Sequence, residues 1–384
     1  MPRVSISLLL LLAFTFPVPL SAQQPSYDNL DVLYVWENLQ QLVTYDIDSS
    51  GNPTQVGKPF PLGRNVYAVV PAPDDHFLYV VSGGSDSPFL ISVHATNSDG
   101  VPQLKPIQTL RIPDVDSLEI GPNGRSAYAI RSYLDGQGFT VGQILLSYVN
   151  SKSGRLNKSF KLEYTSQPDG PCGTGWSEQG WMFFKGFSSD GSKLYTEWFC
   201  TALDWIEGVY FAFDVNPTTG ALGHPRKVFA WAENQSADAV WFAPKAVIDV
   251  GNPGHGEGFG WVNIYPPHGG SKLIFSCTGQ MLEGCGYGGV PDPTGKYIFF
   301  PTSSGGTDVG RIEITKQQIV DTGNTMPSPF LALSPDEQLV YAEASNGSST
   351  SLIIYTFDAQ TGALQQGGII LTGEISHLFP AVRE

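Results

Sequence analysis

A tight turn followed by an apolar strand recurs along most of this sequence. One copy runs from Ser334 to Tyr341, and the strand after it, Leu352–Phe357, ends in a second turn at Asp358–Leu364. Similar pairs of segments return at intervals of roughly 45 to 65 residues, a spacing typical of repeat architectures. The chain is therefore expected to be a ring or stack of similar β units.

The first kind of turn joins two strands into a hairpin, and the physical properties of its residues explain why they occur there. Proline presets φ, Asp or Asn bonds its own backbone, and glycine accepts a positive φ. Such turns precede apolar strands at Pro73–Asp75, Pro122–Gly124, Ser189–Gly191, Pro293–Gly295 and Pro335–Glu337.

The second kind of turn ends a strand with apolar residues at every second position. This alternation indicates a strand whose two faces differ in their packing. The strands are Leu42–Asp48, Leu90–His94, Ile144–Val149, Val209–Val215 and Leu352–Phe357, and a more polar fourth strand follows each of them.

Four antiparallel strands per unit, without helical segments, predict an all-β β-propeller of four-stranded antiparallel blades. Counting the innermost strands gives seven blades, starting near Tyr67, Asp116, Trp181, Ala239, Gly286, Phe330 and Ser376. Val32–Val35 matches a second strand, whereas Ile375–Val382 matches a first one. We therefore expect a seven-bladed ring closed by the C-terminal strand pairing in the N-terminal blade, with residues 23–384 forming a single domain.

The N-terminal residues resemble a secretory signal peptide. Arg3 precedes an apolar run at Leu8–Phe16, and small residues follow at Ser21 and Ala22, which predicts cleavage after residue 22. The run is too short to span a bilayer as a mature helix. We expect a secreted or periplasmic protein with no membrane span.

The net charge of the chain limits the classes of partner that it is expected to bind. With 36 Asp and Glu residues against 21 Lys and Arg, the formal net charge is −15. Because nucleic-acid binding requires clustered Lys and Arg, no nucleic-acid partner is expected. Acidity of this size favours solubility, and we expect a monomer.

Four cysteines in an exported chain predict disulfide bonds, and four thiols allow three connectivities. The preferred pairs are Cys172 with Cys200 and Cys277 with Cys285. Zinc binding is disfavoured because the thiols lack the usual two-residue spacing and paired histidines.

The repeated segments resemble the lactonase-type seven-bladed propellers, the family that includes bacterial 6-phosphogluconolactonase and fungal carboxy-muconate cyclase. The resemblance rests on Phe213–Leu222 and Tyr355–Leu364, with Leu333–Asp336 and Tyr341 similar to the hairpin motif. It implies that this chain opens a lactone or carries out a related reaction. These motifs belong to the scaffold and are shared with binding propellers, so no catalytic residue is assigned through them.

Propellers usually bind ligands at the mouth of the central channel, where loops converge. The most suggestive loop is Gly254–Trp261, in which a neutral His255 could accept a proton from water attacking a lactone carbonyl while Glu257 orients it. The alternative is that the glycines of this loop serve only to form a turn.

Other candidates for ligand binding lie in equivalent loops. Arg64 and Arg131 could hold a carboxylate through paired hydrogen bonds, and Glu178 lies in a long insertion before the fourth predicted blade; His377 lies in the last innermost strand. Each of them could instead be an ordinary surface residue.

No cofactor is required by these patterns. Ca²⁺ remains a minor alternative through Asp114, Asp116, Asp204 and Asp238, although they show no contiguous ligand spacing. The preferred hypothesis is an exported propeller that binds a small polar ligand at the channel mouth and hydrolyses a lactone. The alternative is a non-catalytic binding or protein-interaction propeller, and the sequence does not decide whether the protein is an enzyme.

Overall fold

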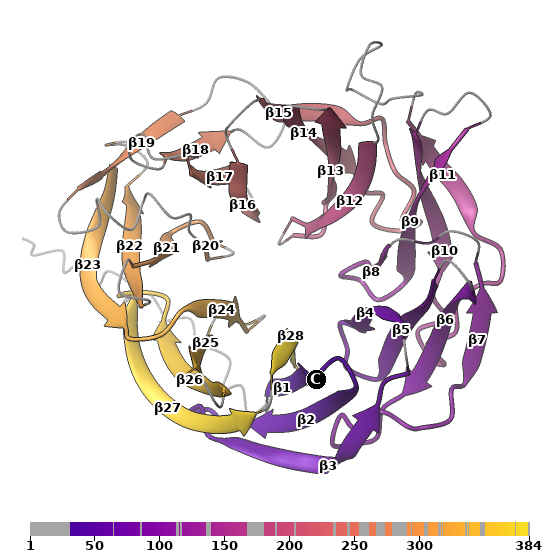
Figure 1. Ribbon diagram of the computed structural model, residues 1–384, viewed down its shortest axis with the longest axis horizontal. Helices are drawn as coiled ribbons and strands as arrows, with labels where there is room; N and C mark the ends of the chain where they lie inside the picture. Colours follow the sequence, from indigo (N-terminus) through magenta and orange to yellow (C-terminus); the bar gives the residue numbers. More distant parts are fainter. Residues whose placement is uncertain are drawn as a thin grey trace, which may run out of the picture.

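The chain folds into a ring of β-sheets (Figure 1). The computed structural model describes residues 31–382 except 64, 85–86, 113–114, 116, 136–139, 167–179, 189, 203–204, 233–235, 244–245, 253–260, 266–272, 279–289, 293, 303–305, 314–315, 317, 335, 337, 346–349 and 373. In this described part of the chain, no helix is long and apolar enough to cross a membrane.

Three sheets come from the two ends and the first part of the chain. Sheet 1 contains β28 (Ile375–Val382), β1 (Asp31–Glu37), β2 (Gln41–Ile47) and β3 (Pro53–Pro61); sheet 2 contains β4 (Val66–Pro71), β5 (Phe77–Gly84), β6 (Ser87–Ala95) and β7 (Gln108–Arg111); sheet 3 contains β8 (Ser117–Ile120), β9 (Ser126–Leu134), β10 (Thr140–Tyr148) and β11 (Lys161–Thr165).

The remaining sheets follow in chain order. Sheet 4 contains β12 (Gly180–Phe187), β13 (Lys193–Ala202), β14 (Trp205–Asp214) and β15 (Arg226–Ala232); sheet 5 contains β16 (Ser236–Ala243), β17 (Ala246–Asn252), β18 (Trp261–Tyr265), β19 (Leu273–Thr278), β20 (Val290–Pro291), β21 (Tyr297–Pro301), β22 (Thr307–Glu313) and β23 (Gln318–Met326); sheet 6 contains β24 (Phe330–Leu333), β25 (Leu339–Ser345), β26 (Thr350–Asp358) and β27 (Ala363–Thr372).

The prediction of seven blades is wrong. The described strands form six hydrogen-bonded sheets, of which five have four strands and sheet 5 has eight. In sheet 5, β19 pairs in parallel with β23, with Ser276 opposite Gln318 and Thr278 opposite Val320. This pairing joins β16–β19 to β20–β23. Counting hairpins could not reveal it, because it links outer strands that are far apart in the sequence.

The predicted all-β fold and ring closure are confirmed. β28 pairs antiparallel with β1, from Val382 opposite Asp31 to His377 opposite Trp36. Figure 1 shows β28 at the inner edge of this sheet, nearest the centre of the ring. The end of the described chain therefore supplies the innermost strand of the sheet that its beginning started.

The hydrophobic core lies between neighbouring sheets rather than at the centre of the ring. Because side chains alternate along a strand, both faces of each sheet carry apolar residues that pack against a neighbour. Ala127 and Ala129 of β9 pack toward sheet 2, whereas Tyr128 and Ile130 of the same strand pack toward sheet 4.

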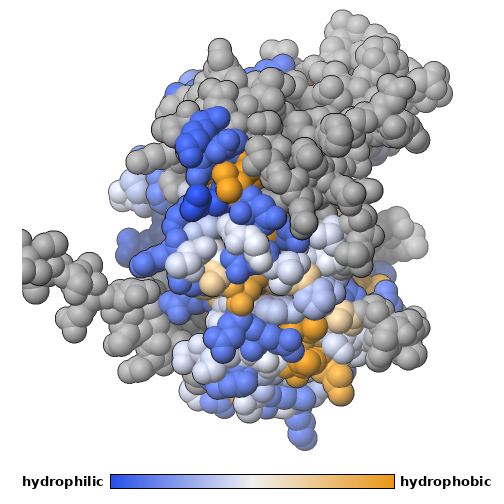
Figure 2. Space-filling view, turned by 90° about the vertical axis from the view of Figure 1, so that its left-hand side faces the viewer, coloured by the Kyte–Doolittle hydropathy of each residue, from blue (hydrophilic) through white to orange (hydrophobic). Residues whose placement is uncertain are grey.

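The ring has two rims. The mouth rim carries the connections that enter innermost strands and those from second to third strands, such as 62–65 and 38–40; the turn rim carries the first-to-second and third-to-fourth strand turns, such as 72–76 and 149–155. Figure 2 shows the outer side of the ring, where hydrophilic residues dominate the coloured surface and a few hydrophobic ones gather in its lower part.

A repeated tyrosine contact connects sheets along the turn rim. Each tyrosine lies on a second strand and has its hydroxyl within hydrogen-bond distance of a backbone carbonyl in a third-to-fourth strand turn of the next sheet. The pairs are Tyr34 with Gly100 at 2.7 Å, Tyr79 with Gly154 at 2.9 Å, Tyr128 with Gly220 at 2.7 Å and Tyr297 with Gln360 at 2.7 Å. The Tyr34 hydroxyl also lies 2.5 Å from Oδ1 of Asp75, so its single hydrogen serves two acceptors. The repeated tyrosines therefore hold adjacent sheets together.

Glycine in these turns is required by both backbone and space. Gly154 has a φ of 62°, and a Cβ at this position would lie 2.3 Å from ring atoms of Phe77 in the neighbouring sheet. The turn can approach sheet 2 so closely only because it carries no side chain at this point.

Candidate functional site

Arg131 lies at the mouth-rim end of β9. Its cross-strand neighbour is Gln143 on β10, and Gln143 in turn is opposite Thr165 on β11. Alternation along β9 places Arg131 on the same face as Ala129, which packs toward sheet 2. The sequence candidate is thus positioned by a row of residues across three strands.

Hydrogen bonds hold the Arg131 guanidinium in one orientation. Its Nε donates to Oε1 of Gln143 at 2.7 Å, and the Nε2 of Gln143 donates to the hydroxyl oxygens of Tyr133 and Thr165, each at 3.3 Å. Gln143 is only 7% exposed, so its side chain has little freedom to move and holds the Arg131 Nε in place. The Tyr133 ring adds a cation–π contact, with its centre 5.5 Å from the Arg131 Cζ.

The two Nη groups of Arg131 make no hydrogen bond or ion pair within the described residues. A guanidinium whose Nε is held by a buried amide presents these two groups as a preoriented fork. Such a fork matches the two oxygens of a carboxylate. In a chain of net charge −15, an arginine for which the structure describes no acidic partner is well suited to an anionic ligand.

His377 lies on β28 opposite Trp36, with the ring centres 5.2 Å apart and the planes at 48°. The histidine is exposed, whereas Trp36 is 2% exposed. The indole Nε1 of Trp36 is buried and has no hydrogen-bond partner among the described residues. No described contact joins His377 to Arg131, because sheet 2 lies between their sheets.

Several predicted site residues lie outside the described part of the chain. They are Arg64, Glu178, His255 and Glu257, together with Cys172 and Cys285. None of the four cysteine side chains lies within the part of the chain that the structure describes, so the pairs Cys172 with Cys200 and Cys277 with Cys285 are not tested. The roles and pairings of these residues therefore remain predictions.

The calcium alternative is also untested at its predicted residues. Asp114, Asp116 and Asp204 lie outside the described residues, and nothing is described of the Asp238 side chain. Within the described residues, no group of three or more His, Cys, Asp and Glu side chains is arranged to hold a metal ion.

Glu119 is a candidate that the sequence analysis missed. It lies on β8, one of the innermost strands (Figure 1), opposite Tyr128. Burial raises its pKa to about 7, because a poorly solvated carboxyl group favours its neutral form. The available signal was its position between Leu118 and Ile120, which places it on the opposite strand face from two apolar residues.

Lys185 is a second charged residue on an innermost strand. It is the extra residue of a β-bulge in β12, where Phe184 pairs with Thr196 and Gly186 with Tyr195. Its Nζ lies 2.7 Å from Oε2 of the buried Glu197 and 5.8 Å from the centre of the Tyr210 ring. Bulges redirect side chains, but this lysine is already neutralised by Glu197.

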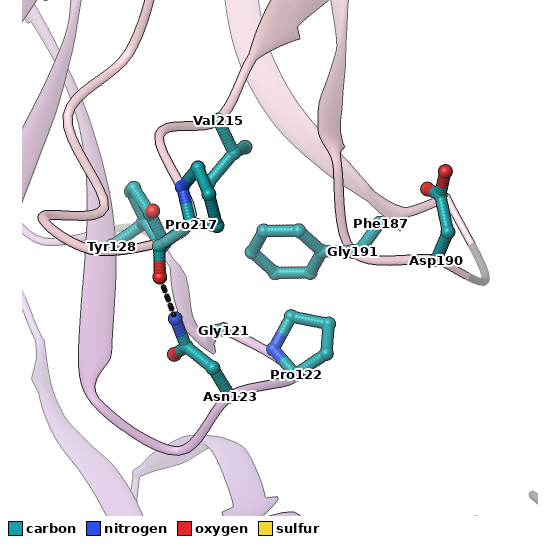
Figure 3. A pocket seen from close by; sticks show the side chains of 9 residues that line it. All are labelled: Gly121, Pro122, Asn123, Tyr128, Phe187, Asp190, Gly191, Val215 and Pro217. Carbon is teal, nitrogen blue, oxygen red and sulfur yellow. Dashed lines mark hydrogen bonds between the residues drawn. The ribbon is translucent and has the colours of Figure 1, made fainter.

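A pocket of about 290 Å³ opens on the turn rim between sheets 3 and 4. Figure 3 shows the rings of Phe187, Pro122 and Pro217 around it. The Nδ2 of Asn123 donates to the Pro217 carbonyl at 3.3 Å and so connects the two turns. This pocket lies on the rim opposite the predicted mouth and is built from repeated turn residues.

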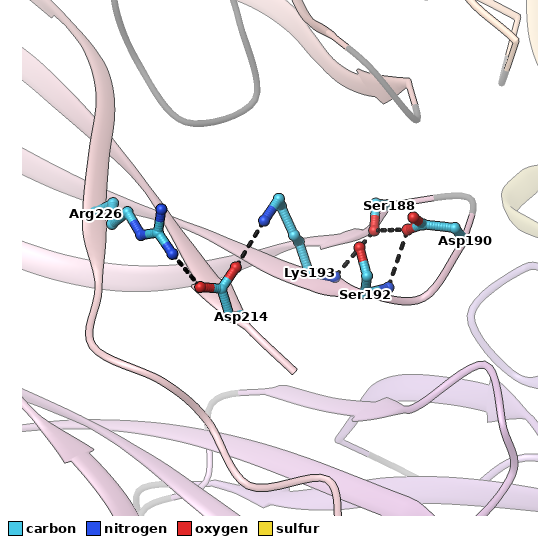
Figure 4. Close-up of polar contacts among 6 residues, drawn as sticks. All are labelled: Ser188, Asp190, Ser192, Lys193, Asp214 and Arg226. Carbon is cyan, nitrogen blue, oxygen red and sulfur yellow. Dashed lines mark hydrogen bonds and ion pairs between the residues drawn. The ribbon is translucent and has the colours of Figure 1, made fainter. Parts of the chain in front are cut away.

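Polar contacts near this pocket support the turns of sheet 4 (Figure 4). Asp190 accepts hydrogen bonds from the Ser188 hydroxyl at 2.6 Å and the Ser192 backbone N–H at 3.0 Å. Lys193 lies 2.6 Å from Asp214 and, with Arg226, lowers the pKa of that carboxyl. Lys193 and Arg226 are paired with Asp214, and Asp190 is occupied by the hydrogen bonds of its own turn, so we assign the group to the scaffold.

Comparisons with known proteins show the fold. No family model matches the chain, and no curated protein matches it. A putative 6-phosphogluconolactonase from Bacteroides uniformis has a similar structure, with a TM-score of 0.56 and 16% identity over 92% of this chain and 100% of that one. A protein from Lactobacillus plantarum gives a TM-score of 0.58 and 12% identity over 92% and 99%. At these identities the similarity establishes the β-propeller fold alone.

Proposed function

We propose that this protein binds a small ligand bearing a carboxylate or similar anionic group at the mouth rim and hydrolyses a lactone ring. The observation that carries the binding part is Arg131, whose Nε is fixed by Gln143 at 2.7 Å while its Nη groups have no protein partner within the described residues. The lactone part is supported by the similar fold of a putative 6-phosphogluconolactonase.

In the proposed reaction, Arg131 supplies a positive charge and His255 supplies a base. Arg131 would hold the anionic group of the ligand and thereby fix the position of the lactone carbonyl. His255 is the predicted base: it takes a proton from water as the water oxygen bonds to the carbonyl carbon. When the ring C–O bond breaks, the imidazolium returns the proton to the departing oxygen. Glu257 is the predicted partner that orients the imidazole.

From the predicted signal peptide we infer that this activity takes place outside the cytoplasm. Because sugar-phosphate lactones are cytoplasmic metabolites, an exported enzyme would act on a different lactone. We therefore favour a lactone bearing a carboxylate over one bearing a phosphate.

A panel of lactones tests the proposal. Neutral, carboxylate-bearing and phosphate-bearing lactones are incubated with the wild type and with Arg131→Met, His255→Ala and Glu257→Ala. We expect turnover of a carboxylate-bearing lactone, with a KM increased about tenfold or more by Arg131→Met, because a charge-assisted hydrogen bond contributes 1.5 to 3 kcal/mol.

Arg125→Met is the matched control for the loss of a positive charge. Arg125 is exposed at the turn-rim end of the hairpin that carries Arg131 at its other end, so its removal should leave KM unchanged. Full activity in both His255→Ala and Glu257→Ala would refute the assigned base. Equal effects of Arg131→Met and Arg125→Met would refute the assigned anion site.

A non-catalytic ligand-binding propeller is the second candidate. It is favoured by the immediate surroundings of Arg131, which are the amide of Gln143 and the hydroxyls of Tyr133 and Thr165, none of which is a general base at neutral pH. Carboxylate binding that depends on Arg131, without turnover of any lactone, would establish this alternative.

A further inference from the structure

Ser117 and Glu119 lie on the same side of the innermost strand β8. Two residues separated by one position point to the same face of a strand, about 7 Å apart. Their cross-strand neighbours are Ile130 and Tyr128, which pack toward sheet 4. This is the opposite face of sheet 3 from the one that carries Arg131, so the two sets of residues form separate sites.

Both side chains are polar and lack protein partners. The Ser117 Oγ is buried and makes no hydrogen bond within the described residues. For the Glu119 carboxyl, whose residue is partly exposed, burial alone accounts for the altered pKa, with no hydrogen bond or charged group contributing. Buried polar groups are normally hydrogen-bonded, and the Ser117 Oγ lacks such a bond within the described residues. Beside it on the same face of this innermost strand lies the partly exposed Glu119, so the two side chains together indicate a position for a ligand.

The wall around them is neutral. From β9, Tyr128 and Ile130 face this side; from β12, Met182 and Phe184 pack into the same cluster. The Tyr128 hydroxyl donates to Gly220, and burial raises the pKa of this tyrosine to about 12. β4, which also contacts β8, carries no charged residue. Lys185 of β12, which also packs against β8, is paired with Glu197 at 2.7 Å, and no charged group contributes to the pKa of Glu119. No described cation is therefore left to neutralise an ionised Glu119 carboxylate.

We infer that the Ser117 and Glu119 side of β8 is a binding site for a neutral ligand that offers a carbonyl or hydroxyl oxygen. A protonated carboxyl group donates one hydrogen bond and accepts others, and the serine hydroxyl can do both. Ionisation of Glu119 removes its donor and places an unpaired negative charge in an apolar wall. The site thus accepts a neutral oxygen compound near neutral pH and releases it in alkali.

The inference does not depend on the lactonase proposal, because it concerns other residues and requires no turnover. The first measurement is a carboxyl titration by carbon NMR of protein labelled in its glutamates. One resonance, absent from Glu119→Gln, should titrate near pH 7. Titration of that resonance near its ordinary value of 4.5 would overturn the inference.

The second measurement is binding of δ-valerolactam, a neutral cyclic amide that has a carbonyl oxygen and resists hydrolysis. Wild-type affinity should fall about fivefold or more between pH 6 and pH 8.5, the size expected for one lost hydrogen bond. Glu119→Gln, which keeps a donor at both pH values, should bind equally at both. Ser117→Ala should bind more weakly at both.

Glu374→Gln is the control, since Glu374 is an exposed carboxylate on the mouth rim, and it should behave as the wild type. Absence of δ-valerolactam binding at pH 6, or the same pH dependence in Glu119→Gln as in the wild type, would overturn the inference. The lactone panel with Arg131→Met decides the proposed function separately, because Arg131 lies on the other face of the sheet.

Discussion

Polar groups on the turn rim and those facing the mouth rim and ring centre are arranged in different ways. On the turn rim, tyrosine hydroxyls such as that of Tyr79 donate to turn carbonyls, and turn carboxylates such as Asp190 accept backbone N–H groups. Toward the mouth and centre, the Arg131 Nη groups, the Ser117 Oγ and the Glu119 carboxyl have no partners among the described residues.

The difference distinguishes polar groups that stabilise the fold from polar groups that are available to a ligand. Turn-rim contacts repeat from sheet to sheet, so selection of these residues can be explained by stability alone. Among the described residues the unpartnered groups do not follow this repeat, and those that are buried reduce stability. Residues of this kind are expected where a ligand completes the hydrogen bonding. Substitutions on the turn rim should therefore change folding, and those near the centre should change binding.

The largest effect is expected from Gly154→Ala. The new Cβ would meet the Phe77 ring at 2.3 Å, and alanine is strained at a φ of 62°. The combined strain and overpacking should lower the free energy of unfolding by about 4 kcal/mol. Gly124→Ala is the matched control: its φ is 63° and a Cβ there meets nothing, so it should cost about 1 kcal/mol by denaturant unfolding. Equal costs would show that the contact with Phe77 is unimportant.

The next largest effect is an increase in the free energy of unfolding, which is expected from Glu119→Gln at alkaline pH. Because the pKa of Glu119 is raised from 4.5 to about 7, its contribution to stability is complete below pH 4.5 and is lost as pH rises through 7. At pH 8 the variant should exceed the wild type by about 2 to 3 kcal/mol, and the difference should vanish near pH 4. Urea unfolding at several pH values measures it, and a constant difference would contradict the burial of this carboxyl.

A smaller destabilisation is expected from Tyr79→Phe. The change removes the donor to the Gly154 carbonyl at 2.9 Å and should lower the free energy of unfolding by about 1 to 2 kcal/mol without altering ligand affinity. Tyr67→Phe, at an exposed tyrosine of β4, should change it by less than about 0.5 kcal/mol. An effect of Tyr79→Phe on binding alone would contradict the separation of the two rims.

The smallest effect concerns His94. Its Nδ1 lies 2.8 Å from the Gln103 carbonyl and its Nε2 lies 3.1 Å from the Ser92 hydroxyl, and burial lowers its pKa below 6.5. Since the unfolded state binds the proton more readily, stability falls as pH drops below 6.5. The advantage of the wild type over His94→Gln should shrink between pH 7.5 and pH 5.5 in thermal unfolding. A growing advantage would mean that the folded protein favours the imidazolium.

Local chemistry explains which parts of the fold could be predicted. The turns at Pro122–Gly124 and Asp358–Leu364 were identified because their residues form turns on their own. The closure of β28 on β1 followed from matching strand types at the two ends. By contrast, the parallel pairing of β19 with β23 leaves no local signal, so the expected number of blades was wrong.

The candidate site likewise could be predicted only where it depends on local sequence. Arg131 was identified from its expected position near the mouth, but its support by Gln143 depends on the register of β9 against β10, which hydrophobic patterns fix only loosely. Glu119 was missed because a glutamate between Leu118 and Ile120 resembles an ordinary alternating strand. Its significance arises from sheet 4 packing against it, which is a contact between distant parts of the chain.

Closure of the ring by β28 has a consequence for biosynthesis. The backbone N–H of Glu374 donates to the Asn38 side chain across 336 positions, so β28 leaves the ribosome long after β1. Until β28 emerges, β1 presents an unpaired edge with a buried apolar face, a configuration that invites pairing with other chains. Nascent chains should therefore require protection of β1 by a chaperone, and truncation before residue 375 should yield aggregates rather than a smaller folded ring.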